Sequence, residues 1–137
     1  NHENYDDMST LRVDRIAHIT VLNERRKPLR EIKGYQQQRT FNVSQYVKEH
    51  IYMFGGESIT VTFKAKRSIV NQILDWFDGN VEFTNIIADN VVCRVRVNHD
   101  AFKYWALQYM QSVKVLTPAS LVTEVKAAIE EGLHQYS

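Results

Sequence analysis

The strongest constraint on the fold of this chain is a change of hydrophobic period within residues 57–97. Apolar residues alternate with polar ones over 59–63, recur every three or four residues over 69–77, and alternate again over 81–84 and 91–97. Alternation predicts a strand with one buried face, and the longer spacing predicts an amphipathic helix. The residues that set these patterns are Ile59, Val61, Phe63, Ile69, Val70, Ile73, Leu74, Phe77, Val81, Phe83, Val91, Cys93, Val95 and Val97.

The remaining elements follow from turn and capping signals. Residues 78–80 (Asp-Gly-Asn) predict a turn, and residues 89–90 (Asp-Asn) predict a hairpin turn. Asp100 is predicted to cap a helix, a short strand is expected at 113–115, and Pro118 is expected at the first position of a last helix. The apolar residues assigned to the inner faces of these two helices are Phe102, Trp105, Ala106, Tyr109, Leu121, Val122, Val125 and Ile129.

The predicted order over residues 57–137 is therefore βαββαβ followed by a helix. This order indicates an α+β, ferredoxin-like fold with both main helices on one face of an antiparallel sheet. A solvated outer face, or one covered by a partner subunit, is favoured over a base-reading surface, because the strands carry Thr and Arg where RNA-recognition domains carry aromatic rings. The residues predicted to point outward are Thr60, Thr62, Lys64, Glu82, Thr84, Arg94, Arg96 and Lys114.

The first 56 residues are organised differently. Residues 1–22 are predicted to be extended, 23–40 to be a polar linker, and 43–53 to form a short helix capped by Asn42 or Ser44 and ended by Gly55 and Gly56. One or two strands cannot bury a face alone, so we expect residues 1–22 to self-associate or to dock elsewhere. The apolar residues that would do so are Leu11, Val13, Ile16, Ile19 and Val21.

Composition excludes several classes of protein. Cys93 is the only cysteine, so no intrachain disulfide forms, and the five histidines show no metal-binding spacing. No apolar run approaches the roughly 18 residues of a membrane span, and the first residues lack the basic-then-apolar order of a signal peptide, so neither is expected. Gly55-Gly56 is not followed by the lysine of a phosphate-binding loop. We therefore expect a cytoplasmic protein with no catalytic residues, no cofactor and no bound metal.

Three segments resemble one protein family, in the family's own order. Residues 11–16 (LRVDRI) and 46–57 (YVKEHIYMFGGE) are similar to the end of a WYL domain and to the linker into its C-terminal extension. Residues 104–110 (YWALQYM), running into 113–118 (VKVLTP), resemble the last third of that extension. WYL domains are the sensing modules of many bacterial helix-turn-helix transcription regulators.

The resemblance implies a domain organisation and two site residues. It assigns 1–40 to the end of the WYL domain, a partial Sm-like β-barrel remnant with a basic linker, 41–56 to a linker helix, and 57–137 to the extension. Arg12 and Arg15 fall on arginine positions of the family's effector groove, whereas Ser9 and Leu11 depart from the family's pattern. A structural role for Arg15 at the domain junction remains an equal alternative.

The partners implied are a second copy of the chain, as a homodimer, and a nucleic-acid or other anionic effector in the WYL groove. Contact with regulated DNA would be made only through a helix-turn-helix absent from these residues, and no membrane partner is expected. The function implied is the effector-sensing and dimerisation region of a WYL regulator. The alternative is a free-standing ferredoxin-like small-molecule-binding or enzyme domain, which requires a polar pocket within 57–137. A third hypothesis, a single-stranded nucleic-acid binder, requires the basic stretch 25–39 to lie beside Arg12, Arg15 or the open sheet face.

Overall fold

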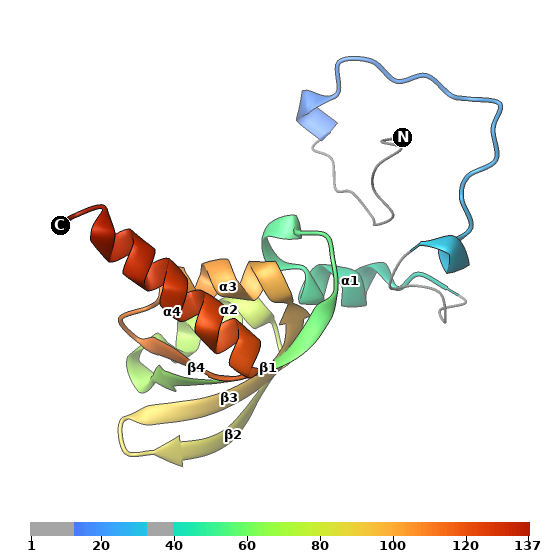
Figure 1. Cartoon of the computed structure of the whole chain (residues 1–137). Helices are drawn as coiled ribbons and strands as arrows, with labels where there is room; N and C mark the ends of the chain where they lie inside the picture. The colour runs from blue at the N-terminus through green and yellow to red at the C-terminus, as the bar shows by residue number, and fades with distance from the viewer. Residues whose placement is uncertain (1–12, 33–39) are drawn as a thin grey trace.

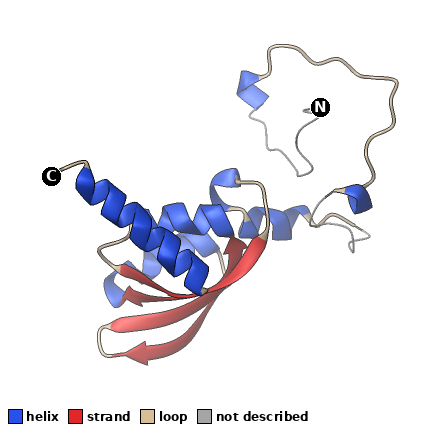
Figure 2. Cartoon of the chain, in the orientation of Figure 1, coloured by secondary structure: helices blue, strands red, loops and turns tan. Residues whose placement is uncertain are grey.

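Four antiparallel strands form one sheet in the order β2-β3-β1-β4, in a computed structural model that describes residues 13–32 and 40–137. Helices α2, α3 and α4 lie on one face of this sheet, and the other face is open (Figures 1 and 2). The order β1-α2-β2-β3-α3-β4 with a final α4 confirms the predicted ferredoxin-like arrangement. The elements are α1 (Val43–Glu49), β1 (Ser58–Lys66), α2 (Val70–Phe77), β2 (Val81–Ile87), β3 (Asn90–Asn98), α3 (His99–Gln108), β4 (Val113–Thr117) and α4 (Ala119–His134).

The core lies between the sheet and the helices and is centred on Phe63 of β1. The Phe63 ring lies 5.3 Å from the ring of Phe102 and 5.4 Å from that of Trp105, both on α3. Phe77 of α2 contacts Trp105 edge-on, with ring centroids 4.8 Å apart. Aromatic pairs at such distances stabilise a core by more than the burial of their apolar surface alone would. Phe63 lies opposite Cys93 of β3 on one side and opposite Val115 of β4 on the other. Three strands therefore contribute residues to the core at this level of the sheet.

Three details at the ends of helices and strands differ from the sequence predictions. Asn98, not Asp100, caps α3, because its side chain accepts a hydrogen bond from Ala101 N. The hairpin turn between β2 and β3 is formed by residues 88–89, with Ala88 at φ 52°, one residue earlier than predicted. Pro118 lies at the N-cap of α4, so the helix begins at Ala119. Each shift is one or two residues and leaves the order of elements unchanged.

Strand β2 is the least buried strand. Phe83 was predicted to point into the core, but its side chain is 40% exposed. The physical reason is the position of β2 at the edge of the sheet, where only β3 flanks it. The register of β2 against β3 also shifts between Phe83 and Asn85. The α4 residue Ile129 is exposed to a similar degree, although it was predicted to face inward.

The strands predicted within residues 1–22 are not formed in the part that the structure describes. Residues 13–15 make a single 3₁₀ turn, and residues 16–22 have no regular structure. Val21 is 92% exposed, and Val13 and Ile19 are nearly as accessible. A strand needs a neighbouring edge for its backbone groups, and residues 13–22 pair with no strand among the described residues. Leu11 and the rest of residues 1–12 lie outside the described residues.

The helix predicted at 43–53 forms only in part. Asn42 caps α1 as expected, through a 3.1 Å hydrogen bond from Gln45 N to its side-chain oxygen. The helix ends at Glu49, before Gly55, and is followed by a 3₁₀ turn over Ile51–Met53. Ile51 is buried in the core of the sheet-and-helix unit although it precedes β1. The segment before β1 is therefore packed against the fold rather than only joined to it.

Asn98 connects this segment to the fold, and its removal should be costly. The side chain is 1% exposed and donates to Gly55 O at 3.0 Å while it caps α3. We predict that Asn98→Ala lowers the free energy of unfolding by about 2–4 kcal/mol, since α3 loses its cap and the Gly55 carbonyl loses its hydrogen bond. Urea unfolding followed by circular dichroism measures this loss.

The matched control is Asn42→Ala, which removes the exposed cap of the seven-residue α1. This substitution should cost about 0.5–1 kcal/mol, as expected for an exposed cap. A loss for Asn98→Ala no larger than that for Asn42→Ala would contradict the role given to Asn98.

Candidate functional site

The described structure places only one of the two predicted site residues. Arg12 lies outside the described residues. Arg15 ends the exposed 3₁₀ turn Val13–Arg15, in a segment that loops away from the sheet and helices (Figure 1). The basic linker residues Arg25, Arg26 and Arg30 are likewise exposed. The effector role of Arg12 and Arg15 therefore remains a prediction.

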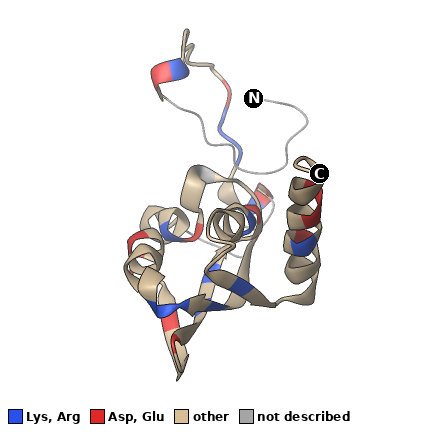
Figure 3. Cartoon of the chain, turned by 90° about the vertical axis from the view of Figure 1, so that its left-hand side faces the viewer, with Lys and Arg blue, Asp and Glu red and all other residues tan. Residues whose placement is uncertain are grey.

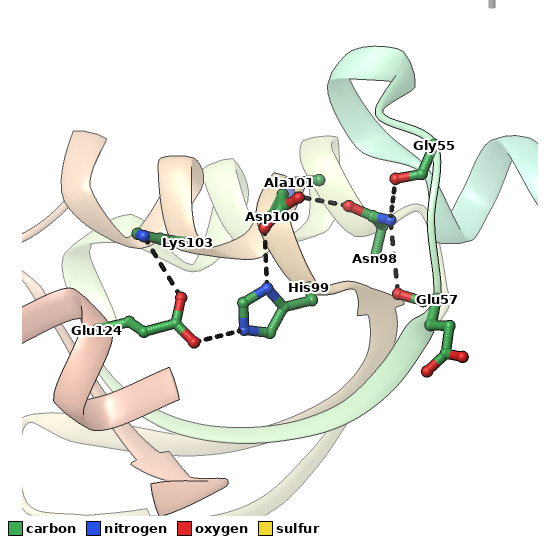
Figure 4. Close-up of polar contacts among 8 residues, drawn as sticks. All are labelled: Gly55, Glu57, Asn98, His99, Asp100, Ala101, Lys103 and Glu124. Atoms are coloured by element: carbon green, nitrogen blue, oxygen red, sulfur yellow. Dashed lines mark hydrogen bonds and ion pairs between the residues drawn. The ribbon is translucent and has the colours of Figure 1, made fainter. Parts of the chain in front are cut away.

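A polar cluster at the start of α3 was not predicted (Figure 4). His99 Nδ1 lies 2.9 Å from Asp100 Oδ1, and His99 Nε2 lies 3.1 Å from Glu124 Oε1 on α4. Lys103 Nζ donates to the second oxygen of Glu124 at 3.4 Å. No local sequence signal could have identified this cluster, because 25 residues separate His99 from Glu124.

The side chains of this cluster connect α3 to α4 and form what we call a polar clamp. Glu124 receives contacts from both His99 and Lys103, and its side chain is only partly exposed. Exposed ion pairs of this kind typically contribute up to about 1 kcal/mol each. Both oxygens of Glu124 are thus engaged, one by His99 and the other by Lys103.

A shallow hollow of about 460 Å³ lies where the segment before β1 meets α3, lined by Tyr52, Phe54, Tyr104 and Gln108. Phe54 stacks on Tyr104 with ring centroids 5.2 Å apart and planes 4° from parallel. The Tyr52 hydroxyl donates to Gln108 Oε1 at 2.6 Å. Burial, with a smaller contribution from Tyr109, raises the pKa of the Tyr52 hydroxyl above 10.0, so it remains a donor at neutral pH.

This hollow does not meet the requirement of the small-molecule alternative. Tyr52 and Phe54 precede residue 57, so the hollow is not formed wholly within 57–137. The Tyr52 hydroxyl and the Gln108 carbonyl oxygen also bond each other instead of converging on the open space. A pocket that selects a small ligand usually presents unpaired polar groups toward it. The hollow therefore gives the small-molecule alternative no support.

Cys93 is fully buried on the inner face of β3, as predicted. Burial raises the pKa of its thiol to about 11, so the thiolate needed for nucleophilic attack or metal binding is scarce at neutral pH. Within the described ranges, no group of three His, Cys, Asp or Glu side chains is arranged to hold a metal ion. Nor is any helix in the described part of the chain long and apolar enough to cross a membrane.

The outer face of the sheet carries the residues predicted for it. Thr60, Arg94, Arg96 and Lys114 are exposed, and Lys64 is half-buried. Blue segments along the strands mark Lys and Arg in Figure 3. This face is polar and basic, without the aromatic rings of a base-stacking surface.

Comparison with known proteins identifies the family. Residues 55–133 match the WCX domain, a match that covers more than half of the chain and includes every strand of the sheet. No curated protein matches the chain closely enough to count as a relative. The predicted resemblance and the observed fold agree with this match. The chain therefore belongs to the WCX family, the C-terminal extensions of WYL-domain regulators.

Proposed function

We propose that this chain is the C-terminal effector-sensing and dimerisation region of a bacterial WYL transcription regulator that works in the cytoplasm. The observation that carries the proposal is the WCX match over residues 55–133 on a ferredoxin-like fold. DNA-sequence reading would belong to a helix-turn-helix elsewhere in the regulator. Effector binding would shift the population between dimer arrangements, by an amount set by the difference in effector affinity between them.

The β2 edge is the surface that best fits a second copy of the chain. Ile86 is 63% exposed, and Phe83 and Ile87 are also accessible. Natural edge strands are usually protected by charged residues, proline, a bulge or a covering element. Strand β2 contains no lysine or proline, and its protection is limited to Glu82 and the register shift between Phe83 and Asn85. Antiparallel pairing of two β2 strands would satisfy the free backbone groups and bury these side chains.

We predict that the chain forms a dimer and that Ile86→Lys weakens it at least tenfold. A charged side chain at this position would lie inside the paired edges, where desolvation opposes association. Sedimentation velocity at about 100 μM protein detects dimers whose dissociation constants are micromolar.

The matched control is Leu133→Lys, which places the same charge at a similarly exposed apolar residue near the end of α4. It should leave the dimer unchanged. A monomeric parent at this concentration, or equal weakening by both substitutions, would argue against pairing through β2.

The effector part of the proposal rests on Arg12 and Arg15. Guanidinium groups bind phosphate through two parallel hydrogen bonds, which suits an anionic effector such as short single-stranded DNA. Loss of one charge-assisted hydrogen bond typically costs about 1.5–3 kcal/mol, or roughly ten- to a hundredfold in affinity. We therefore predict such a loss for Arg12→Ala and Arg15→Ala in the complete regulator, titrated with single-stranded DNA at two salt concentrations.

Arg25→Ala is the control, because it removes an exposed arginine from the linker segment. It should change the affinity by less than about threefold, a loss typical of a solvent-screened charge. If Arg12→Ala and Arg15→Ala bind like the parent with the same salt slope, the effector site lies elsewhere. Weakened binding by Arg12→Ala alone, with a lowered melting temperature for Arg15→Ala, would assign Arg15 to the domain junction.

A further inference from the structure

The open face of the sheet concentrates positive charge. Among the residues at outward positions of the strands, Lys64 of β1 lies directly opposite Lys114 of β4, and Thr62 of β1 lies opposite Arg94 of β3. Lys66 and Arg96 occupy further outward positions on β1 and β3. Glu82, opposite Arg94, is the one acidic residue at an outward strand position. We call this surface, made of Lys64, Lys66, Arg94, Arg96 and Lys114, the basic sheet face.

Most of these charges are not neutralised within the fold. Arg96 lies 3.5 Å from Glu49 of α1. Lys64, Lys66, Arg94 and Lys114 form no ion pair with any residue in the ranges 13–32 and 40–137. Like charges directly opposite each other on adjacent strands are destabilising, and Lys64 is half-buried. A bound anion would attract both Lys64 and Lys114 and so offset the repulsion between them.

The shape and composition of the face favour a polyanion over a protein partner. Cations two residues apart on one strand, such as Lys64 and Lys66, are about 6.6–6.8 Å apart along it, so the charge is spread rather than focused on one point. Protein interfaces have apolar, aromatic centres that are depleted of lysine. On the outward positions of β1 and β3, Val92 is the one apolar residue, and it lies opposite Lys64 of β1 and Asn85 of β2.

The face also favours duplex over single-stranded nucleic acid. Proteins that hold single strands stack the exposed bases on aromatic side chains. The outward positions of β1 and β3 hold no aromatic residue. A duplex keeps its bases stacked inside and presents phosphates, which lysine, arginine and threonine hydroxyls contact without reading sequence.

We propose that the basic sheet face binds the phosphate backbone of duplex DNA without sequence preference. In the complete regulator this contact would add to base-specific binding by the helix-turn-helix, but the inference does not depend on Arg12, Arg15 or the dimer. Non-specific binding of this kind has dissociation constants of about 10⁻⁴–10⁻⁶ M and weakens steeply with salt.

The test is fluorescence anisotropy of the 137-residue chain with two labelled duplexes of about 20 base pairs and unrelated sequence, at two salt concentrations. The double variant Lys64→Gln/Lys114→Gln should weaken binding about tenfold and reduce the salt slope by about two, since each phosphate contact contributes about 0.9. Its melting temperature should equal or exceed that of the parent, because a like-charge pair is removed. A lowered melting temperature would contradict the repulsion argued here.

Two controls remove the same charge elsewhere. Lys48→Gln/Lys126→Gln removes two charges from helices α1 and α4, and Arg25→Gln/Arg26→Gln removes two charges from the linker. Each should weaken binding less than about threefold, as expected of screened surface charges. A larger effect of the linker pair than of the sheet pair would overturn the proposal.

Three further outcomes would also overturn the proposal. The first is that the chain binds no duplex at low salt, and the second is that it prefers one duplex sequence tenfold over the other. The third is that a single strand or polyglutamate binds more tightly than the duplexes do. Arg12→Ala should leave duplex binding unchanged, so a failed effector site and a failed sheet face are distinguishable.

Discussion

The fold depends on one packing constraint, the burial of the inner face of the sheet under three helices. Phe63 at the middle of β1 contacts Phe77 of α2 and both Phe102 and Trp105 of α3. These rings cannot be covered unless the two βα units fold back onto the same face. Burying large aromatic side chains is among the strongest contributions to a small core. The position of every other surface of the domain follows from this one-sided arrangement.

One-sided packing leaves an open sheet face and an exposed edge, and these are the surfaces to which we assign function. The open face is basic, and the β2 edge carries accessible apolar side chains. The helix layer has its own polar clamp, in which Glu124 of α4 contacts His99 and Lys103 of α3. Binding surfaces and the stabilising core are thus separated, so that substitutions on the open face need not disturb the fold.

Sequence periodicity predicted the core well, because the signals that specify it are local. Val61, Phe63 and Cys93 alternate with polar residues, and Ile73 and Phe77 follow helical spacing, so each reveals its inner face without knowledge of its partners. Local signals were less reliable at the ends of elements. Both Asn98 and Asp100 can cap a helix, and the choice of Asn98 depends on its contact with Gly55, which lies 43 residues earlier.

The features that sequence could not predict depend on tertiary position. Phe83 has the pattern of a core residue, yet its strand lies at the edge of the sheet. Val13 and Val21 have strand spacing, yet no described strand pairs with them. The contact between Tyr52 and Gln108 joins residues 56 positions apart. Arg12 and Arg15 were identified by family resemblance alone, and the described structure adds no contact that assigns their role.

The central claim is that residues 51–125 close their core without residues 13–32, and hydrogen–deuterium exchange of the whole chain tests it most directly. Amides of β1 and β3 should exchange only through global unfolding, because both strands are flanked on each side. Amides of residues 13–32 should exchange at rates near those of an unstructured chain. Protection of residues 13–22 equal to that of β3 would contradict the claim and make the N-terminal segment part of the fold.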